Sequence, residues 1–116
     1  MNTEKIALKL QKFATERDWD QFHTPKNLAT SISVESAELL ELFQWTRGQK
    51  DWSEIEEVEI KEKIENEVAD ILLYLIRFSD LAKIDLEKVA LRKITSNAQK
   101  YPIEKSKGSD KKYNEK

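Results

Sequence analysis

The chain has 116 residues, of which 36% are charged, and its net charge is −2 at pH 7. This length suggests one compact domain, and the acidic balance lacks the basic surface expected of a protein that binds a nucleic-acid polymer. With no cysteine and a single histidine, disulfides and thiolate sites are excluded and zinc is a poor candidate metal. Two glycines and two prolines leave little turn chemistry for strands, so an all-α fold is favoured.

The chain carries no sign of a membrane or secretory segment. It has no run of 18 apolar residues, and its N-terminus lacks the apolar stretch of a signal peptide. We therefore expect no membrane partner, and the lack of cysteine fits a cytoplasmic protein.

The first two predicted helices flank a polar loop. Thr3 can cap a helix that runs to about Arg17. Its inner face carries apolar residues at helical spacing: Ile6, Leu10, Phe13 and Ala14. The loop RDWDQFHTP follows, and we expect His23 within it to be structural rather than catalytic. Thr24 and Pro25 then predict a second helix, to about Trp45, because a hydroxyl N-cap followed by proline suits a helix start.

A glutamate lies in the middle of the apolar stripe of this second helix. At about 100° per residue, five apolar side chains lie within about 60° of one direction, namely Leu28, Ile32, Leu39, Leu42 and Phe43. Glu35 falls about 20° from the centre of that stripe. Because an unpaired buried carboxylate is costly or changes its pKa, Glu35 needs a partner in the core.

The third predicted helix is apolar on nearly all sides. Ser53 and Glu56 form a capping-box pattern, and the pattern stays helical to Ala82 with room for a break near Glu59. The run VADILLYLI within it covers well over half of the helix circumference. Such a helix is buried on several sides, and so short a chain has few helices to cover it. We therefore expect burial against another subunit, in a homo-oligomer.

The last predicted helix begins after Asp85, runs to about Lys100 and ends before Pro102. Residues 103–116 are charged and have no apolar period, which predicts a disordered tail after a domain of residues 1–102. The expected fold is an all-α bundle of four or five helices, with a core completed by oligomerisation.

Two pairs of carboxylates point to a metal site. Glu35 and Glu38 are neighbours on one helical face, and Glu67 and Asp70 repeat that spacing on the third helix, with Tyr74 one turn further. If these helices pack antiparallel, the four carboxylates converge, and a hard divalent cation would offset their repulsion. All-oxygen ligands favour Mg²⁺, or alternatively Mn²⁺. The competing interpretation is that these are solvated faces of a highly charged protein.

Basic and aromatic residues suggest a phosphorylated, planar ligand. Lys93, Asn97 and Lys100 share one face of the last helix, where they could bind phosphates around Mg²⁺ or simply suit a helix C-terminus. Trp19 and Trp45 are placed at helix ends, where an aromatic ring could stack on a nucleobase or cap a core.

The ordered motifs resemble those of a known family. ESAE (35–38) followed by EVAD (67–70) resembles the ExxE…ExxD signature of the MazG-like all-α nucleoside triphosphate pyrophosphohydrolases. The segments RDWDQFHTPKNL (17–28), ELLELFQW (38–45), DILLYL (70–75) and NAQKYP (97–102) resemble the dCTP pyrophosphatase branch. The resemblance covers about residues 5–102.

The resemblance implies hydrolysis of a deoxynucleoside triphosphate to the monophosphate and diphosphate, as a cleaning step for the nucleotide pool. It implies that Glu35, Glu38, Glu67 and Asp70 are Mg²⁺ ligands, and that dimers or tetramers build the sites between subunits. It also implies a set of substrate-binding residues: Trp19, Trp45, Tyr74, Lys93, Asn97, Lys100 and Tyr101. Vertebrate members of the branch have a base-pocket histidine where this chain has Leu10, so the preferred base stays open.

Two other functions compete with this one. A di-iron carboxylate bundle requires Glu-x-x-His pairs, whereas the sole histidine of this chain lies in a loop. A non-enzymatic helical oligomerisation or nucleotide-binding module with an acidic patch would lack stabilisation by a divalent metal.

Overall fold

The computed structural model describes residues 1–48 and 52–112, and over these ranges the chain forms five α-helices and no strand. The predicted all-α class is confirmed. The chain divides into two compact units, Met1–Lys83 and Ile84–Lys116, and each is described by itself. The predicted domain end at residue 102 stays a prediction.

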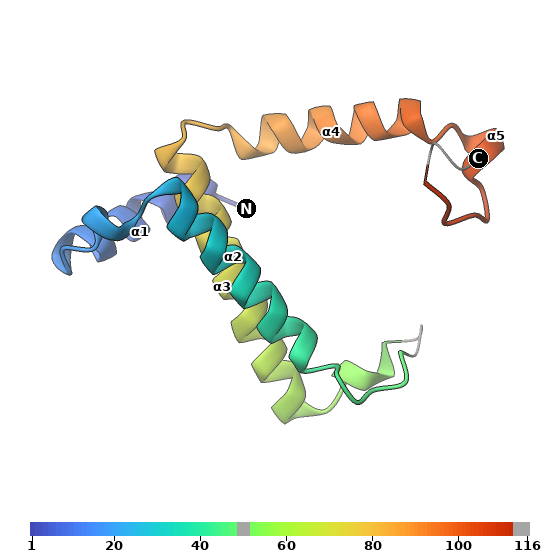
Figure 1. Ribbon diagram of the computed structural model, residues 1–116, viewed down its shortest axis with the longest axis horizontal. Helices are drawn as coiled ribbons and strands as arrows, with labels where there is room; N and C mark the ends of the chain where they lie inside the picture. The colour runs from blue at the N-terminus through green and yellow to red at the C-terminus, as the bar shows by residue number, and fades with distance from the viewer. Residues whose placement is uncertain (49–51, 113–116) are drawn as a thin grey trace. The chain divides into compact units, whose positions relative to one another are not determined.

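The first unit is built on a pair of antiparallel helices. α2 (Pro25–Glu41) and α3 (Val58–Leu81) lie side by side and run in opposite directions (Figure 1). α1 (Thr3–Glu16) packs on α3, where Gln11 Nε2 donates a hydrogen bond of 2.7 Å to Asp80 Oδ2. The antiparallel pairing that the carboxylate argument required is therefore present.

Local capping signals account for most of the helix starts. Thr24 caps α2 as predicted, since its side chain accepts a hydrogen bond of 3.1 Å from the Asn27 amide. Asn2, rather than Thr3, caps α1 through a bond from the Lys5 amide. The amide side chain of Asn2 can cap as well as a hydroxyl can, so the prediction missed the helix start by one residue.

Two helix ends differ from the prediction. α2 ends at Glu41, and residues 42–45 form turns instead of continuing the helix to Trp45. The sequence left room for a break near Glu59, and one occurs just before it, since a short 3₁₀ helix (Ser53–Ile55) precedes α3, which begins at Val58. Glu57, rather than Ser53, is therefore the N-cap position of α3.

The core of the first unit takes one apolar side chain from each long helix. Ala14, Leu28 and Ile76 are at most 3% exposed. Several apolar side chains of α2 and α3 stay exposed instead, namely Val34, Leu40, Val58, Val68, Leu75 and Leu81. Such a surface is what an oligomer would cover, and oligomerisation stays a prediction. Over the described ranges, no helix is both long and apolar enough to span a bilayer.

The second unit carries the predicted last helix. α4 (Leu86–Lys100) is capped by Asp85, whose side chain accepts a hydrogen bond from the Lys88 amide. A four-residue helix, α5 (Ile103–Ser106), follows Pro102 at the start of the segment predicted to be disordered. The end of that predicted tail, residues 113–116, lies outside the described residues.

Candidate functional site

Three of the four predicted metal ligands meet between α2 and α3. Glu35, Glu38 and Glu67 each place a carboxylate oxygen within 4.8 Å of the others. Glu35 and Glu38 are three residues apart on α2 and therefore share a face, while Glu67 reaches them from the antiparallel α3. Glu35 therefore points toward two other carboxylates, with which it forms one cluster.

The arrangement leaves negative charge without a donor. Oε2 of Glu35 and Oε2 of Glu67 are buried, and neither accepts a hydrogen bond. The adjacent Glu67 carboxyl, burial, and the carboxylates of Glu38 and Asp70 together raise the pKa of Glu35 to about 7. A carboxyl so perturbed beside like charges is a candidate functional group.

The donor set fits a hard divalent cation. Buried carboxylate oxygens without donors gain a partner when a cation binds between them, and this set offers oxygen ligands only. Mg²⁺ and Mn²⁺ both accept such ligands, whereas zinc favours nitrogen and sulfur. The residues therefore suit a divalent metal, as the sequence suggested.

Asp70 lies at the edge of this cluster, and its side chain lines an adjacent pocket. Its charge contributes to the raised pKa of Glu35, and its side chain lines a cavity of about 670 Å³. The three-oxygen set within 4.8 Å does not include Asp70 among the described residues. Asp70 thus connects the carboxylate cluster with the pocket, and its role as a direct metal ligand stays a prediction.

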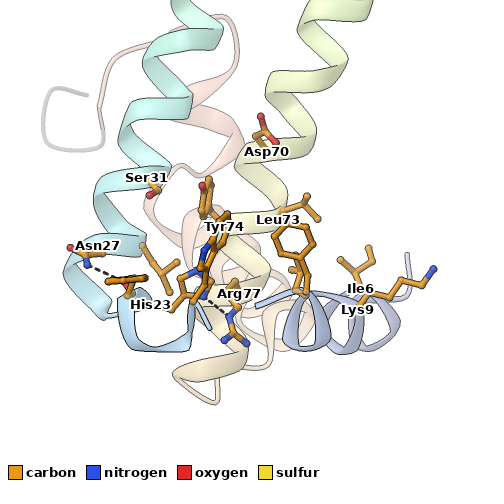
Figure 2. Close-up of a pocket in the computed structure, with 14 residues that line it drawn as sticks. Ile6, Lys9, His23, Asn27, Ser31, Asp70, Leu73, Tyr74 and Arg77 are labelled. Atoms are coloured by element: carbon orange, nitrogen blue, oxygen red, sulfur yellow. Dashed lines mark hydrogen bonds between the residues drawn. The ribbon is translucent and has the colours of Figure 1, made fainter. Parts of the chain in front are cut away.

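The pocket is lined by apolar and aromatic side chains with a few polar groups. Tyr74, one turn along α3 from Asp70, forms part of the wall (Figure 2). Trp19, from the segment before α2, also lines the pocket. Leu10 also lines the pocket, at the position where the resemblance placed a base-contacting histidine. A pocket with flat aromatic walls and few polar groups suits a planar, partly polar ligand such as a nucleobase.

Trp19 is held in the wall by its aromatic neighbour. The rings of Phe13 and Trp19 meet edge to face with centroids 5.6 Å apart. The Arg17 guanidinium lies over the Phe13 ring, with its carbon 3.7 Å from the ring centroid. The indole remains 44% exposed, which leaves area for a ligand to stack on.

Sequence reasoning missed a buried arginine at the far end of the pocket. Arg77 is 4% exposed, and its Nη2 donates to Asp20 Oδ1 at 2.6 Å while its Nε donates to His23 Nδ1 at 3.0 Å. Burial, then the charge of Arg77, lower the pKa of His23, and Asp20 opposes them. The signal in the sequence was a charge directly after the apolar run VADILLYLI. His23 thus accepts a hydrogen bond from Arg77 and also lines the pocket, and the expectation that it is not catalytic stays a prediction.

The remaining predicted substrate contacts are not part of this pocket. Trp45 follows α2 and is 89% exposed, and over the described residues the pocket wall does not include it. Lys93, Asn97 and Lys100 lie on one exposed face of α4, and Tyr101 follows it, all in the second unit. Their contact with a substrate stays a prediction.

Comparisons with known proteins agree with the motifs. The model of the MazG-like family matches residues 30–115. The chain is 41% identical to dCTP pyrophosphatase 1 of Bos taurus over 106 residues and 38% identical to that of Homo sapiens over 108 residues. These alignments cover 88% and 90% of this chain and 60% and 61% of the two relatives, so the chain spans about three fifths of their length.

A solved structure is similar over most of its length. The crystal structure of a pyrophosphatase from Archaeoglobus fulgidus superimposes with a TM-score of 0.80 at 43% sequence identity. The match covers 88% of this chain and 94% of that one.

Proposed function

The chain belongs to the MazG-like family, and from this premise we propose that it is a Mg²⁺-dependent nucleoside triphosphate pyrophosphohydrolase. Its substrate is a deoxynucleoside triphosphate, which water cleaves to the monophosphate and diphosphate. The observation that carries the proposal is the set of three carboxylates, two with buried oxygens that lack donors, next to an aromatic pocket. The names of the relatives, dCTP pyrophosphatase and pyrophosphatase, support the same chemistry.

The carboxylates hold Mg²⁺, or Mn²⁺ in its place. When bound, the metal polarises phosphoryl oxygens and lowers the pKa of water, which favours attack on phosphorus. Glu35, Glu38 and Glu67 are its ligands, and Asp70 joins them from the pocket side. Glu38 is the exposed member of the three, so it is also placed to accept a proton from water that enters from solvent.

The pocket binds the base. Trp19 and Tyr74 provide aromatic wall area, on which a base can stack with a gain of about 1–3 kcal/mol per base. Because Leu10 can neither donate nor accept a hydrogen bond, the preference need not be strict for cytosine. Trp45 is not among the described residues that line this pocket, but the family resemblance implies that it also contacts the base.

Residues at the C-terminal end of α4 are the proposed contacts to phosphate, as the family resemblance implies. Lys93 and Lys100 bind the leaving diphosphate, Asn97 contacts a phosphate or sugar oxygen, and Tyr101 lies beside them. A homo-oligomer, dimer or tetramer, in the cytoplasm completes the proposal.

The proposal is tested by replacing one carboxylate with its isosteric amide. Glu38→Gln keeps side-chain size but removes a metal ligand and proton acceptor, so we expect release of diphosphate from deoxynucleoside triphosphates to fall by about 100-fold or more. Glu41→Gln, an exposed carboxylate one turn further on α2, is the control and should retain full rate. Undiminished turnover in Glu38→Gln would remove this residue from the mechanism.

A non-enzymatic nucleotide-binding module is the alternative. It would bind deoxynucleoside triphosphates in the same pocket and release no diphosphate under any metal condition.

A further inference from the structure

Arg77 is a buried cation whose two side-chain partners lie in one short turn. Its exposed fraction is 4%, and its Nε and Nη2 bond to His23 and Asp20, which are 54 and 57 residues away in sequence. Both partners belong to the segment between α1 and α2, and Figure 2 shows His23 beside Arg77. A buried charge needs such partners, and here both lie on one short segment. Other bonds tie this segment to α1 and α2, such as Thr15 Oγ1 to Asp20 Oδ2 at 3.1 Å and Asn27 Nδ2 to the Phe22 carbonyl at 2.9 Å, whereas the two bonds from Arg77 tie it to α3.

That segment carries part of the pocket wall. Trp19 precedes the 3₁₀ turn Asp20–Phe22 and Phe22 ends it, and both line the pocket together with Arg77 and His23. On α3, Asp70, Tyr74 and Arg77 follow one another on the same face at spacings of four and three residues. Arg77 therefore joins the helix that bears the carboxylates to the turn that bears the aromatic wall.

The geometry also determines where the proton of His23 lies. A guanidinium can only donate, so Nδ1 of His23 accepts from Arg77 Nε at 3.0 Å and carries no hydrogen. The neutral ring then has its proton on Nε2. Over the described residues no protein group accepts from Nε2, and His23 lines the pocket, so this N–H is available to a ligand.

We propose that Arg77 is a positioning residue for base recognition, which holds the 19–23 turn against α3 and keeps His23 in the Nε2–H tautomer. The pocket then presents a donor at a fixed place, and it selects a base edge that offers an acceptor there, such as a pyrimidine carbonyl oxygen. This inference rests on the proposed function, since it concerns how the substrate's base is read. Without Arg77 the ring can rotate and exchange tautomers, so that edges offering donors are no longer rejected.

The single histidine of the chain makes the first half of the proposal directly measurable. In ¹⁵N-labelled full-length protein, only two ring nitrogens of histidine contribute signals. We expect a protonated Nε2 and an unprotonated Nδ1 in the wild type at pH 7.5, and in Arg77→Met a shift of both signals toward the averaged values of a free imidazole. A protonated Nδ1 in the wild type, or unchanged signals in Arg77→Met, would overturn the proposal.

Steady-state kinetics with Mg²⁺ test the second half. For dCTP, dUTP, dTTP, dATP and dGTP we expect Arg77→Met to raise KM for the preferred substrate about five- to tenfold. The ratio of kcat/KM between the best and second-best substrates should fall as well. Arg77→Lys keeps the charge but lacks the planar guanidinium that reaches two partners, so it should also raise KM and lower the kcat/KM ratio. This variant replaces Arg77→Met in the test if Arg77→Met does not fold.

The control is another hydrogen bond from the N-terminal segment to α3. Gln11→Met removes the bond to Asp80 outside the pocket and should leave both KM and selectivity unchanged. Equal selectivity in the Arg77 variants and the wild type would refute the positioning role while the proposed hydrolase stands. A wild type that hydrolyses none of the five nucleotides would instead refute the proposed function, and the inference with it.

Discussion

Glu35 places a carboxylate oxygen in a buried position without a hydrogen-bond donor, where the ionised form is destabilised. Its pKa of about 7, raised by the Glu67 carboxyl, burial, and the charges of Glu38 and Asp70, exceeds the usual value of 4.5. Between these two values the folded, metal-free protein retains a proton that the unfolded chain has released. Stability of the metal-free protein therefore falls as pH rises through this window.

Metal binding reverses that dependence, because the cation requires the ionised carboxylate. Competition with one proton of pKa near 7 should make the apparent Kd for Mg²⁺ about tenfold lower at pH 8 than at pH 6. Thermal unfolding at both pH values, with EDTA or with Mg²⁺, checks this. We expect a lower Tm at pH 8 with EDTA and a larger rise with Mg²⁺ there.

Glu35→Gln provides the matching variant for this test. The amide cannot ionise, so the Tm with EDTA should no longer fall between pH 6 and 8, and Mg²⁺ should stabilise the variant much less. An equal Mg²⁺ effect at both pH values in the wild type would mean that Glu35 does not exchange its proton for the metal.

The start of α2 determines how the pocket turn enters the helix that bears the carboxylates. Thr24 Oγ1 accepts the hydrogen bond of 3.1 Å from the Asn27 amide, and the Asn27 side chain donates to the Phe22 carbonyl at 2.9 Å. Thr24→Ala should lower the free energy of unfolding by about 1 kcal/mol, measured by urea denaturation. Thr24→Ser keeps the acceptor and should cost far less, and equal losses in the two variants would show that the cap bond is not the cause.

Signals confined to one helix could be read from the sequence. The caps at Thr24 and Asp85 depend on neighbouring residues only, and Glu35 stood out because a helix has a fixed period. The end of α2 at Glu41 was missed because no glycine or proline marks the turn that follows.

Contacts between distant segments could not be read in the same way. Arg77 and His23 are 54 residues apart, and their meeting depends on the path of a turn that has no periodic pattern. The charge of Arg77 directly after an apolar run could be noticed, but no neighbouring residue identified its partners. The meeting of Glu35, Glu38 and Glu67 is the exception, because both carboxylate pairs repeat one spacing on two helices expected to pack antiparallel.

At the scale of the whole molecule, apolar surface remains to be covered. Val68 and Leu75 are 50% and 39% exposed and lie on one face of α3, seven residues apart. We expect light scattering to give a mass two or four times 13.6 kDa, and Val68→Glu to shift the protein toward smaller species. A wild type that is monomeric and still unfolds cooperatively would contradict the expectation of an oligomer.

The most direct test of the whole account follows the products of the wild-type protein by ³¹P NMR. With Mg²⁺ and each common deoxynucleoside triphosphate, the account predicts signals of a monophosphate and diphosphate for at least one base, and none when EDTA replaces the metal. Orthophosphate with a nucleoside diphosphate would place the cleavage at a different bond. No product with any nucleotide, in Mg²⁺ or Mn²⁺, would contradict the proposed enzyme and leave the carboxylates as a binding site.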